Sequence, residues 1–238
     1  KYFEEQGFSI DHFIEMTMST DTPEGIAKSM GLGLISFGQL FGRWKPDVLM
    51  VLGDRYEMLA ATSAAMPFAI PIAHLHGGEA TEGLIDEPIR HSITKMSNFH
   101  FVSNKIYAKR VKQLGESPKN IFIVGGFGVD LIKNTKLKTK KTLEKNLKFK
   151  FAKKNILVTY HPETTKGSNP KKDFTEILKA ISTFKDTNFI FTKANADANG
   201  LVINKMIDSF VKKNKSRCKA FFSMGQINYF SSLKTVDA

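Results

Sequence analysis

Short apolar runs and helical patterns alternate through the first half of the chain. Residues 47–53 form an apolar run without polar alternation, which is typical of a parallel strand covered on both faces. An alanine-rich helix is expected at 56–66. Three further strands are expected at 70–75, 98–102 and 121–124, with helices at 87–97 and 105–114. This βαβαβαβ order predicts an α/β fold with a doubly wound parallel sheet.

The alternation breaks after Gly125 and Gly126 and restarts near residue 155. Strands are expected at 155–160, 188–192 and 218–222, and helices at 171–184, 201–213 and 227–233. The lysine-rich segment in between is interpreted as a solvated linker. We therefore predict one domain at 1–135, a linker at 136–154 and a second domain at 155–238. Two such units usually bind a ligand in the cleft between them, at the carboxyl ends of the strands.

Both ends of the sequence suggest a longer protein. Residues 1–7 have the pattern of a last helical turn that is stopped by glycine. Residues 235–238 stop where a new strand is expected to begin. We therefore expect both domains to be incomplete, with the first strand of the N-terminal domain missing.

Composition and charge narrow the class of protein. The 238 residues are 42% hydrophobic, enough for a packed core, and no apolar run is long enough to suggest a membrane span. The sequence has no signal-peptide pattern and a single cysteine, Cys218, so we expect a cytoplasmic protein without an intramolecular disulfide. The net charge of +12 could indicate a nucleic-acid partner. Much of the excess positive charge lies between Lys133 and Lys154, however, which favours the interpretation of this segment as a linker. We expect neither a nucleic-acid nor a membrane partner.

Polar residues with reactive side chains lie at the predicted strand ends. Asp54 and Arg55 follow the first strand, and the segment from His76 to Glu79 follows the second. His161 follows the first strand of the second domain. Histidine titrates near neutral pH, and arginine can bind phosphate through two hydrogen bonds. This set therefore suits proton transfer beside an anionic leaving group.

Structural roles are an alternative for several of these residues. Asp54 could be the N-cap of the following helix, and Arg55 could pair with a nearby glutamate at the surface. Arg90 lies one helical turn after Asp86, so these two could form an ion pair on the helix surface.

His74 and His76 open a second interpretation, a metal-dependent hydrolase. They lie two residues apart on a predicted strand and are expected to point to the same side, as in known His-x-His metal sites. Asp54, Asp86 or Glu79 could complete the ligands, but no spacing requires them. Without a metal, His74 is interpreted as a hydrogen-bonded histidine at the sheet edge. We expect no metal.

Two glycine patterns bear on ligand binding. Gly77 and Gly78 remove side chains where substrate or backbone must approach closely. The sequence has no Walker phosphate loop and no Gly-x-Gly-x-x-Gly fingerprint, so we expect no nicotinamide cofactor.

Four motifs follow one another along nearly the whole chain. They are Gly53-Asp54-Arg55-Tyr56-Glu57, His74-Leu75-His76-Gly77-Gly78-Glu79, Asp86-Glu87-Pro88-Ile89-Arg90-His91-Ser92-Ile93-Thr94-Lys95 and Tyr160-His161-Pro162-Glu163-Thr164-Thr165. In this order and combination they resemble the hydrolysing UDP-N-acetylglucosamine 2-epimerases of bacterial sialic acid and legionaminic acid biosynthesis. The resemblance implies a GT-B fold, with two Rossmann-like domains around a cleft and UDP bound by the second.

The resemblance also implies a reaction. Loss of UDP with removal of the sugar C2 proton would give a glycal-like intermediate, and water addition on the other face would release N-acetylmannosamine. An alternative substrate is a UDP-diacetamido-sugar of legionaminic acid biosynthesis. No metal or redox cofactor is required for this reaction, and relatives are commonly homodimers.

Residue roles follow by position in the motifs. Asp54 matches the family's catalytic aspartate, Asp86 matches a second active-site acid, and His161 matches the histidine near the UDP leaving group. Arg55 and Arg90 match arginines of the substrate site.

Three further positions complete the expected site. Asn195 matches an asparagine on the nucleotide side, and Glu79 is expected in the substrate site with an open role. His76 stands where many relatives, including the non-hydrolysing 2-epimerases, carry a glutamate. The sialic acid and legionaminic acid branch carries the His-x-His-Gly-Gly-Glu form instead. Asp54 and His76 are therefore equal candidates for the base that removes the C2 proton.

Overall fold

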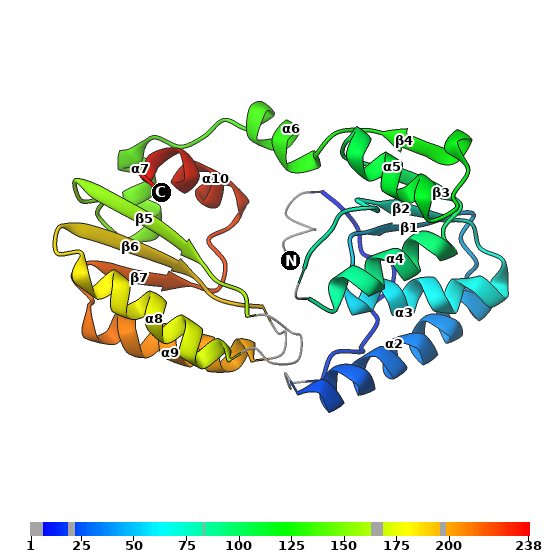
Figure 1. Cartoon of the computed structure of the whole chain (residues 1–238), viewed down its shortest axis with the longest axis horizontal. Helices are drawn as coiled ribbons and strands as arrows, with labels where there is room; N and C mark the ends of the chain where they lie inside the picture. The colour runs from blue at the N-terminus through cyan, green and yellow to red at the C-terminus, as the bar shows by residue number, and fades with distance from the viewer. Residues whose placement is uncertain (1–6, 19–21, 83, 163–168, 196–198) are drawn as a thin grey trace. The chain divides into compact units, whose positions relative to one another are not determined.

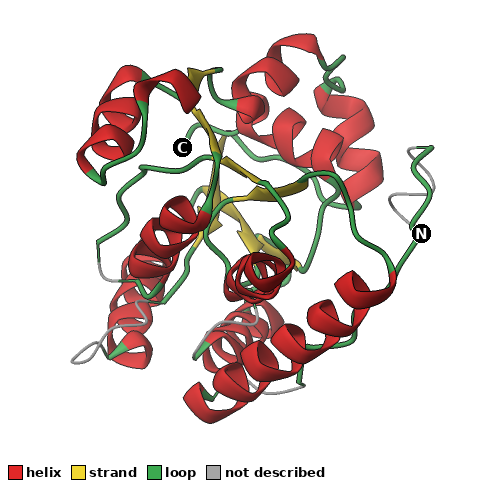
Figure 2. Ribbon diagram, turned by 90° about the vertical axis from the view of Figure 1, so that its right-hand side faces the viewer, coloured by secondary structure: helices red, strands yellow, loops and turns green. Residues whose placement is uncertain are grey.

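The computed structural model describes residues 7–18, 22–82, 84–162, 169–195 and 199–238 (Figure 1). The chain divides into two compact units, Lys1–Gly126 and Phe127–Ala238, each with its own parallel sheet. Helices make up most of the regular structure and flank short strands (Figure 2). Within the described ranges, no helix combines the length and apolar character needed to cross a membrane.

The first unit is built on a four-stranded parallel sheet in the order β1-β2-β3-β4. Each strand is joined to the next by a helix, as the alternation in the sequence predicts. The parallel α/β fold class is thereby confirmed for this unit. Its strands are β1 (Leu49–Leu52), β2 (Ile72–Leu75), β3 (Phe99–Val102) and β4 (Ile121–Ile123), and its helices are α2 (Pro23–Arg43), α3 (Tyr56–Ala65), α4 (Asp86–Met96) and α5 (Lys105–Gln113), with short 3-10 turns η1 (Met66–Phe68) and η2 (Pro118–Asn120).

The strand order places the connecting helices of this unit on one face of the sheet. Right-handed crossovers between strands that follow one another in sequence order return to the same face each time. Val51 in β1 is accordingly buried, while its neighbours Met50 and Leu52 are 64% and 56% exposed. The expectation that this strand is covered on both faces is therefore wrong for the described residues.

The second unit is built on a three-stranded parallel sheet in the order β5-β6-β7. Its core contains Cys218, which is 3% exposed, among aromatic and branched side chains. The strands are β5 (Lys154–Thr159), β6 (Thr187–Thr192) and β7 (Cys218–Phe221), and the helices are α6 (Phe127–Asn134), α7 (Lys140–Leu147), α8 (Pro170–Thr183), α9 (Gly200–Lys213) and α10 (Gln226–Thr235).

The lysine-rich segment differs from the solvated linker expected at 136–154. Its helix α7 buries Leu143 and Leu147, which are 0% and 2% exposed. These two leucines pack with Phe149, Phe151 and Ile190 in one core cluster. The lysines lie on the opposite side of an amphipathic helix, so the segment is a layer of the second unit.

The two faces of the second sheet are covered by different helices. Phe189 and Phe191 of β6 pack in the cluster that contains residues of α8 and α9. Ile190, which alternates with them, packs with the α7 segment and with residues next to or within α10. The first unit ends at Gly126 rather than at residue 135, because α6 groups with the second unit.

The chain ends differ in what the structure describes. The helix end expected at residues 1–7 lies outside the described residues except for residue 7. At the other end, Asp237 donates its backbone N–H to the carbonyl oxygen of Asn155, and Leu157 donates to the carbonyl oxygen of Ala238, both at 2.8 Å. The last residues therefore lie along β5.

Candidate active site

The carboxyl end of β1 turns sharply into the first polar residues. Gly53 follows β1 with a φ of +81°, in the left-handed region that favours glycine. Its N–H donates to the carbonyl oxygen of Leu75 at 2.9 Å. Its own carbonyl oxygen lies 2.8 Å from Nε2 of His74. β2 therefore fixes both backbone polar groups of Gly53, and with them the start of Asp54.

Asp54 and Arg90 form an ion pair at this edge of the sheet. Arg90 lies on α4 and is 3% exposed. Its guanidinium also donates to the backbone oxygen of Glu79 at 2.8 Å and to the hydroxyl of Thr81 at 3.0 Å. Burial lowers the pKa of Arg90, but arginine stays charged at neutral pH. The Asp54 carboxylate compensates this buried charge and connects β1 to α4 and to the loop after β2.

The helix after Asp54 begins with Arg55 as its N-cap residue, and no side-chain capping bond forms there. The alternative in which Asp54 caps this helix is therefore wrong. Nε of Arg55 lies 3.5 Å from Oε2 of Glu57, and its guanidinium lies 5.5 Å from the centre of the Tyr56 ring. Arg55 is thus partly exposed directly beside Asp54.

His76 and Glu79 are joined by a short hydrogen bond after β2. Nδ1 of His76 lies 2.7 Å from Oε1 of Glu79. The hydroxyl of Ser103, after β3, donates to the same carboxylate oxygen at 3.3 Å. His76 has a φ of +64°, which is uncommon for a residue other than glycine. Strained backbone of this kind is often found at functional sites.

The loop between these residues lies directly on α5. Gly78 has a φ of +78°, and a Cβ atom there would lie 2.5 Å from the carbonyl oxygen of Tyr107. A Cβ atom on Gly77 would lie 3.0 Å from Nδ1 of His74. The sequence predicted that these glycines permit a close approach, and the structure identifies backbone and a buried side chain as what they approach.

The expected pairing of His74 with His76 on one strand is wrong. β2 ends at Leu75, so the strand alternation stops before His76. His74 lies 3.1 Å from the hydroxyl of Thr94 through Nδ1 and contacts Gly53 through Nε2. Both of its ring nitrogens therefore have protein partners. In the part of the chain that the structure describes, no three His, Cys, Asp or Glu side chains are grouped to hold a metal.

The start of α4 brings a second acid to this edge. Asp86 is the first residue of α4, one helical turn before Arg90. Oε2 of Glu87 accepts the backbone N–H of Thr81 at 2.7 Å, which ties the preceding loop to the helix. Within the first unit, the structure thus brings Asp54, Arg90 and the loop residue Glu79 together, with Asp86 on the same helix as Arg90.

Sequence reasoning missed three hydroxyl residues of this site, Thr81, Ser103 and Thr94. Thr94 lies four residues after Arg90 on α4, so helical spacing could have placed both on one face. Thr81 and Ser103 lie in loops and carry no such signal.

The second unit carries its expected residues at the carboxyl ends of its own strands. His161 follows β5 and Asn195 follows β6, and both are exposed. The amide group of Asn204 accepts the N–H of Ala194 at 2.8 Å and donates to its carbonyl oxygen at 3.0 Å, which fixes the backbone before Asn195. Motif residue Glu163, like the two threonines after it, lies outside the described residues.

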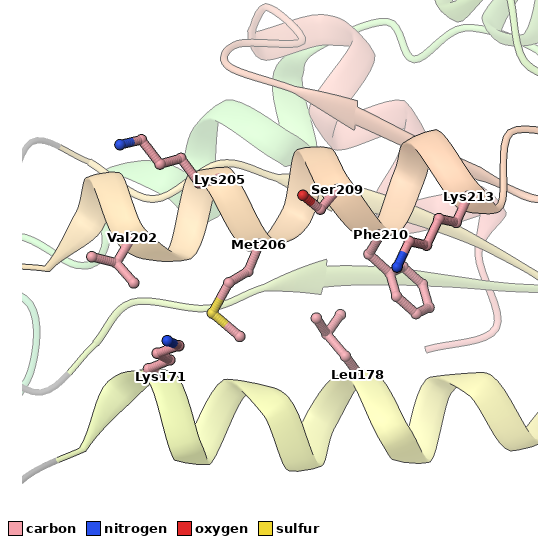
Figure 3. Close-up of a pocket in the computed structure, with 8 residues that line it drawn as sticks. All are labelled: Lys171, Leu178, Val202, Lys205, Met206, Ser209, Phe210 and Lys213. Carbon is pink, nitrogen blue, oxygen red and sulfur yellow. The ribbon is translucent and has the colours of Figure 1, made fainter.

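A groove between α8 and α9 lies apart from these strand ends. It has a volume of about 440 Å³ and an apolar floor that includes Leu178, Met206 and Phe210. Figure 3 shows Leu178 and Met206 pointing toward each other from the two helices. The described residues that line this groove all lie on α8 or α9, and none of them is a predicted site residue.

Comparison with known proteins extends the motif resemblance to the whole chain. A family model described as UDP-N-acetylglucosamine 2-epimerase matches residues 1–238. A Campylobacter jejuni protein named GDP/UDP-N,N'-diacetylbacillosamine 2-epimerase (hydrolyzing) is 44% identical over 98% of this chain and 61% of its own length. The Escherichia coli polysialic acid biosynthesis protein P7 is 40% identical over 90% of this chain and 55% of its own length.

Solved structures show the same fold at low sequence identity. The Neisseria meningitidis UDP-GlcNAc 2-epimerase bound to UDP-GlcNAc has a TM-score of 0.77 at 16% identity, covering 98% of this chain and 64% of that one. The Methanocaldococcus jannaschii UDP-GlcNAc 2-epimerase in complex with UDP-GlcNAc and UDP has a TM-score of 0.73 at 19% identity, covering 98% and 63%. The chain therefore spans about three fifths of the length of these proteins.

Proposed function

The chain belongs to the UDP-N-acetylglucosamine 2-epimerase family, and from this premise we propose that the complete protein is a hydrolysing 2-epimerase of a UDP-sugar. One observation supports this most directly. The Asp54–Arg90 ion pair and the His76–Glu79 hydrogen bond meet through the backbone oxygen of Glu79, at the carboxyl edge of a parallel sheet. Ligands of α/β proteins bind at this edge.

The proposed reaction is an elimination followed by hydration. A base removes the C2 proton of the sugar, the bond between C1 and the UDP oxygen breaks, and a glycal-like intermediate forms. Water then adds across the C1–C2 double bond with the proton delivered to the opposite face of C2. The products are UDP and the free sugar with inverted C2.

His76 is supported as the base by its hydrogen bond to Glu79. A carboxylate that accepts Nδ1–H of a neutral imidazole fixes the tautomer in which Nε2 holds the lone pair. Asp54 lies in an ion pair with Arg90, which stabilises its ionised form and weakens it as a base. We propose that the charged Asp54 carboxylate orients the sugar, and that Asp86 is the second acid of the site.

The remaining residues are assigned to the leaving group. Arg55 supplies positive charge at this edge, which suits a diphosphate, whereas the buried Arg90 is assigned to the substrate site through its ion pair with Asp54. His161 and Asn195 follow strands of the second unit and are assigned to UDP. Each of these roles rests on motif position together with placement at a strand's carboxyl end.

Two candidate substrates are UDP-N-acetylglucosamine and a UDP-diacetamido-sugar. Relatives that are 44% and 35% identical carry the name N,N'-diacetylbacillosamine 2-epimerase, whereas the Neisseria meningitidis UDP-N-acetylglucosamine 2-epimerase is 27% identical. This order of identity favours a UDP-diacetamido-sugar over UDP-N-acetylglucosamine.

Product analysis in D₂O tests the reaction. The complete protein is incubated with UDP-N-acetylglucosamine and, separately, with UDP-N,N'-diacetylbacillosamine. We expect one of them to release UDP and a free sugar that carries deuterium at C2. Absence of UDP release from both would refute the proposed function, and release of UDP with retained C2 hydrogen would refute the elimination.

Variants at the base test the residue roles. His76→Ala is expected to lower kcat by about 100-fold or more, which is the usual contribution of a general base. His12→Ala, an exposed histidine of the first unit, serves as the matched control. Equal activity of the two variants would remove His76 from the mechanism.

A further inference from the structure

The proposed mechanism gives no role to His74, although its ring is held more completely than those of the proposed catalytic residues. His74 lies in β2 and is 0% exposed. Nε2 lies 2.8 Å from the carbonyl oxygen of Gly53, and Nδ1 lies 3.1 Å from Oγ1 of Thr94. Side chains of this kind, buried and bonded at both polar atoms, fix the groups that they contact.

The two contacts determine the tautomer of His74. A carbonyl oxygen can only accept, so Nε2 must carry the proton that bonds Gly53. Burial lowers the pKa of His74 to about 4, so the ring is neutral at neutral pH and Nδ1 is an acceptor. The hydroxyl of Thr94 therefore donates to Nδ1. The result is a series of two hydrogen bonds, in which the Thr94 hydroxyl donates to the imidazole and the imidazole donates to the Gly53 carbonyl.

The second of these hydrogen bonds ends on the peptide group that joins Gly53 to Asp54. The Gly53 carbonyl belongs to the same peptide plane as the N–H of Asp54, so the hydrogen bond from His74 sets the orientation of that plane. Gly53 has a φ of +81°, and none of the described residues would lie within 4 Å of a Cβ atom there, so packing among them does not hold it in place. Hydrogen bonds from β2 hold it instead.

Two successive turns of α4 act on Asp54, one directly and one through His74. Arg90 pairs with the Asp54 carboxylate, and Thr94, four residues later, reaches the preceding carbonyl through His74. Gly77 lies over this second contact, since a Cβ atom there would lie 3.0 Å from Nδ1 of His74 and 3.1 Å from Oγ1 of Thr94. The side chain of Asp54 is thus held by α4 through Arg90, and its backbone is held by the same helix through Thr94 and His74.

We propose that His74 and Thr94 are positioning residues, which hold the Gly53–Asp54 peptide so that the Asp54 carboxylate meets Arg90 and the sugar in the reactive geometry. This inference rests on the proposed function, because it assigns Asp54 to that reaction. A small displacement of a group that orients the sugar lowers turnover strongly, while the contacts assigned to UDP, which also contribute to substrate binding, do not change.

Matched pairs of variants in the complete protein test the inference. Thr94→Val removes the donor to Nδ1 at nearly constant volume, and Thr94→Ser retains it. His74→Asn withdraws the donor from Gly53, and His74→Gln places an amide N–H near the position of Nε2. Thr62→Val is the control, since Thr62 is equally buried in a helix and its hydroxyl donates to the Met58 carbonyl oxygen.

We expect Thr94→Val and His74→Asn to lower kcat by about 10- to 100-fold with KM within about twofold. Thr94→Ser and His74→Gln are expected to recover most of that loss, and Thr62→Val is expected to leave kcat per folded molecule unchanged. If Thr94→Val and His74→Asn lose activity only in proportion to folded protein, as a structural role predicts, the inference is overturned. A rise in KM at constant kcat would also overturn it.

A second measurement separates this inference from the proposed function. The amide ¹H–¹⁵N resonance of Asp54 reports the orientation and exchange of the Gly53–Asp54 peptide, whatever the enzyme acts on. It is expected to shift and to exchange faster in Thr94→Val and to stay in place in Thr94→Ser and Thr62→Val. An unmoved Asp54 resonance refutes the inference even if the wild type turns over a UDP-sugar, and a wild type without turnover refutes only the proposed function.

Discussion

Replacing Gly78 by alanine is expected to destabilise the first unit because the loop after β2 lies against the backbone of α5. Gly78 has a φ of +78°, and a Cβ atom there would lie 2.5 Å from the Tyr107 carbonyl oxygen and 2.8 Å from Cγ2 of Val111. Val111 is 0% exposed and cannot move into solvent. The loop or the helix must therefore shift.

The loss of stability caused by Gly78→Ala has two parts, one from the backbone conformation and one from packing. A left-handed conformation costs an alanine about 1 kcal/mol, partly offset by the lower entropy of alanine in the unfolded chain. Forcing a methyl group into closely packed backbone adds about 2 kcal/mol. We therefore expect Gly78→Ala to lower the free energy of unfolding by about 2 to 3 kcal/mol in total.

Gly125→Ala isolates the first part of this cost. Gly125 has a φ of +83°, nearly that of Gly78, but a Cβ atom there would have no neighbour within 4 Å in the part of the chain that the structure describes. Its substitution is expected to cost at most about 1 kcal/mol. The difference between the two variants therefore measures the contact between the loop and α5.

Denaturant unfolding followed by tryptophan fluorescence provides the assay. The chain has a single tryptophan, Trp44, and it lies in the first unit, so its signal reports that unit. Equal destabilisation by Gly78→Ala and Gly125→Ala would show that the loop is not pressed against α5, and the reasoning for this site would be refuted.

Two further outcomes follow from buried polar groups. Burial lowers the pKa of His74 to about 4, below its ordinary value of 6.5, so the unfolded chain binds more protons between these values and stability falls as the pH drops through them. Between pH 7 and pH 5 this loss of stability is about 2 kcal/mol, and we expect it to be absent from His74→Gln. Denaturant unfolding of both proteins at the two pH values measures it. Equal losses in the wild type and in His74→Gln would contradict the prediction. Asn204→Leu leaves the N–H and carbonyl of Ala194 without their partner, so we expect a loss of about 2 kcal/mol and faster hydrogen exchange just before Asn195. Unchanged exchange protection there, measured by mass spectrometry, would count against the role of Asn204.

Several features could be predicted because their signals are local. Parallel strands in a βα alternation give short apolar runs bounded by helical patterns, and seven strands were located this way with small shifts of their ends. The motifs are contiguous, so the family resemblance and the parallel α/β class could be predicted, and both are confirmed. The positions of Asp54, His76 and His161 after strands follow from the same alternation.

The lysine-rich segment shows how a strong compositional signal can hide a structural one. Its lysines suggested a solvated linker, yet Leu143 and Leu147 lie four residues apart, as on one helical face, and Phe149 and Phe151 alternate after them. Charge determines which side of such a helix faces water. The apolar positions determine whether it packs, and here they cover one face of the second sheet.

What the sequence determined by itself is the order of elements, the class of fold, the family and the residues that end each strand. Tertiary structure decided which of those residues meet. Arg90 pairs with Asp54 across 36 positions of sequence because β1 and β2 are neighbours in register and α4 returns to the same edge. His76 leaves the strand pattern because its backbone turns left-handed at the end of β2, while His74 stays inside and bonds to Gly53. Such contacts depend on register, crossover and loop geometry between distant segments, and these have no counterpart in the local pattern of the chain.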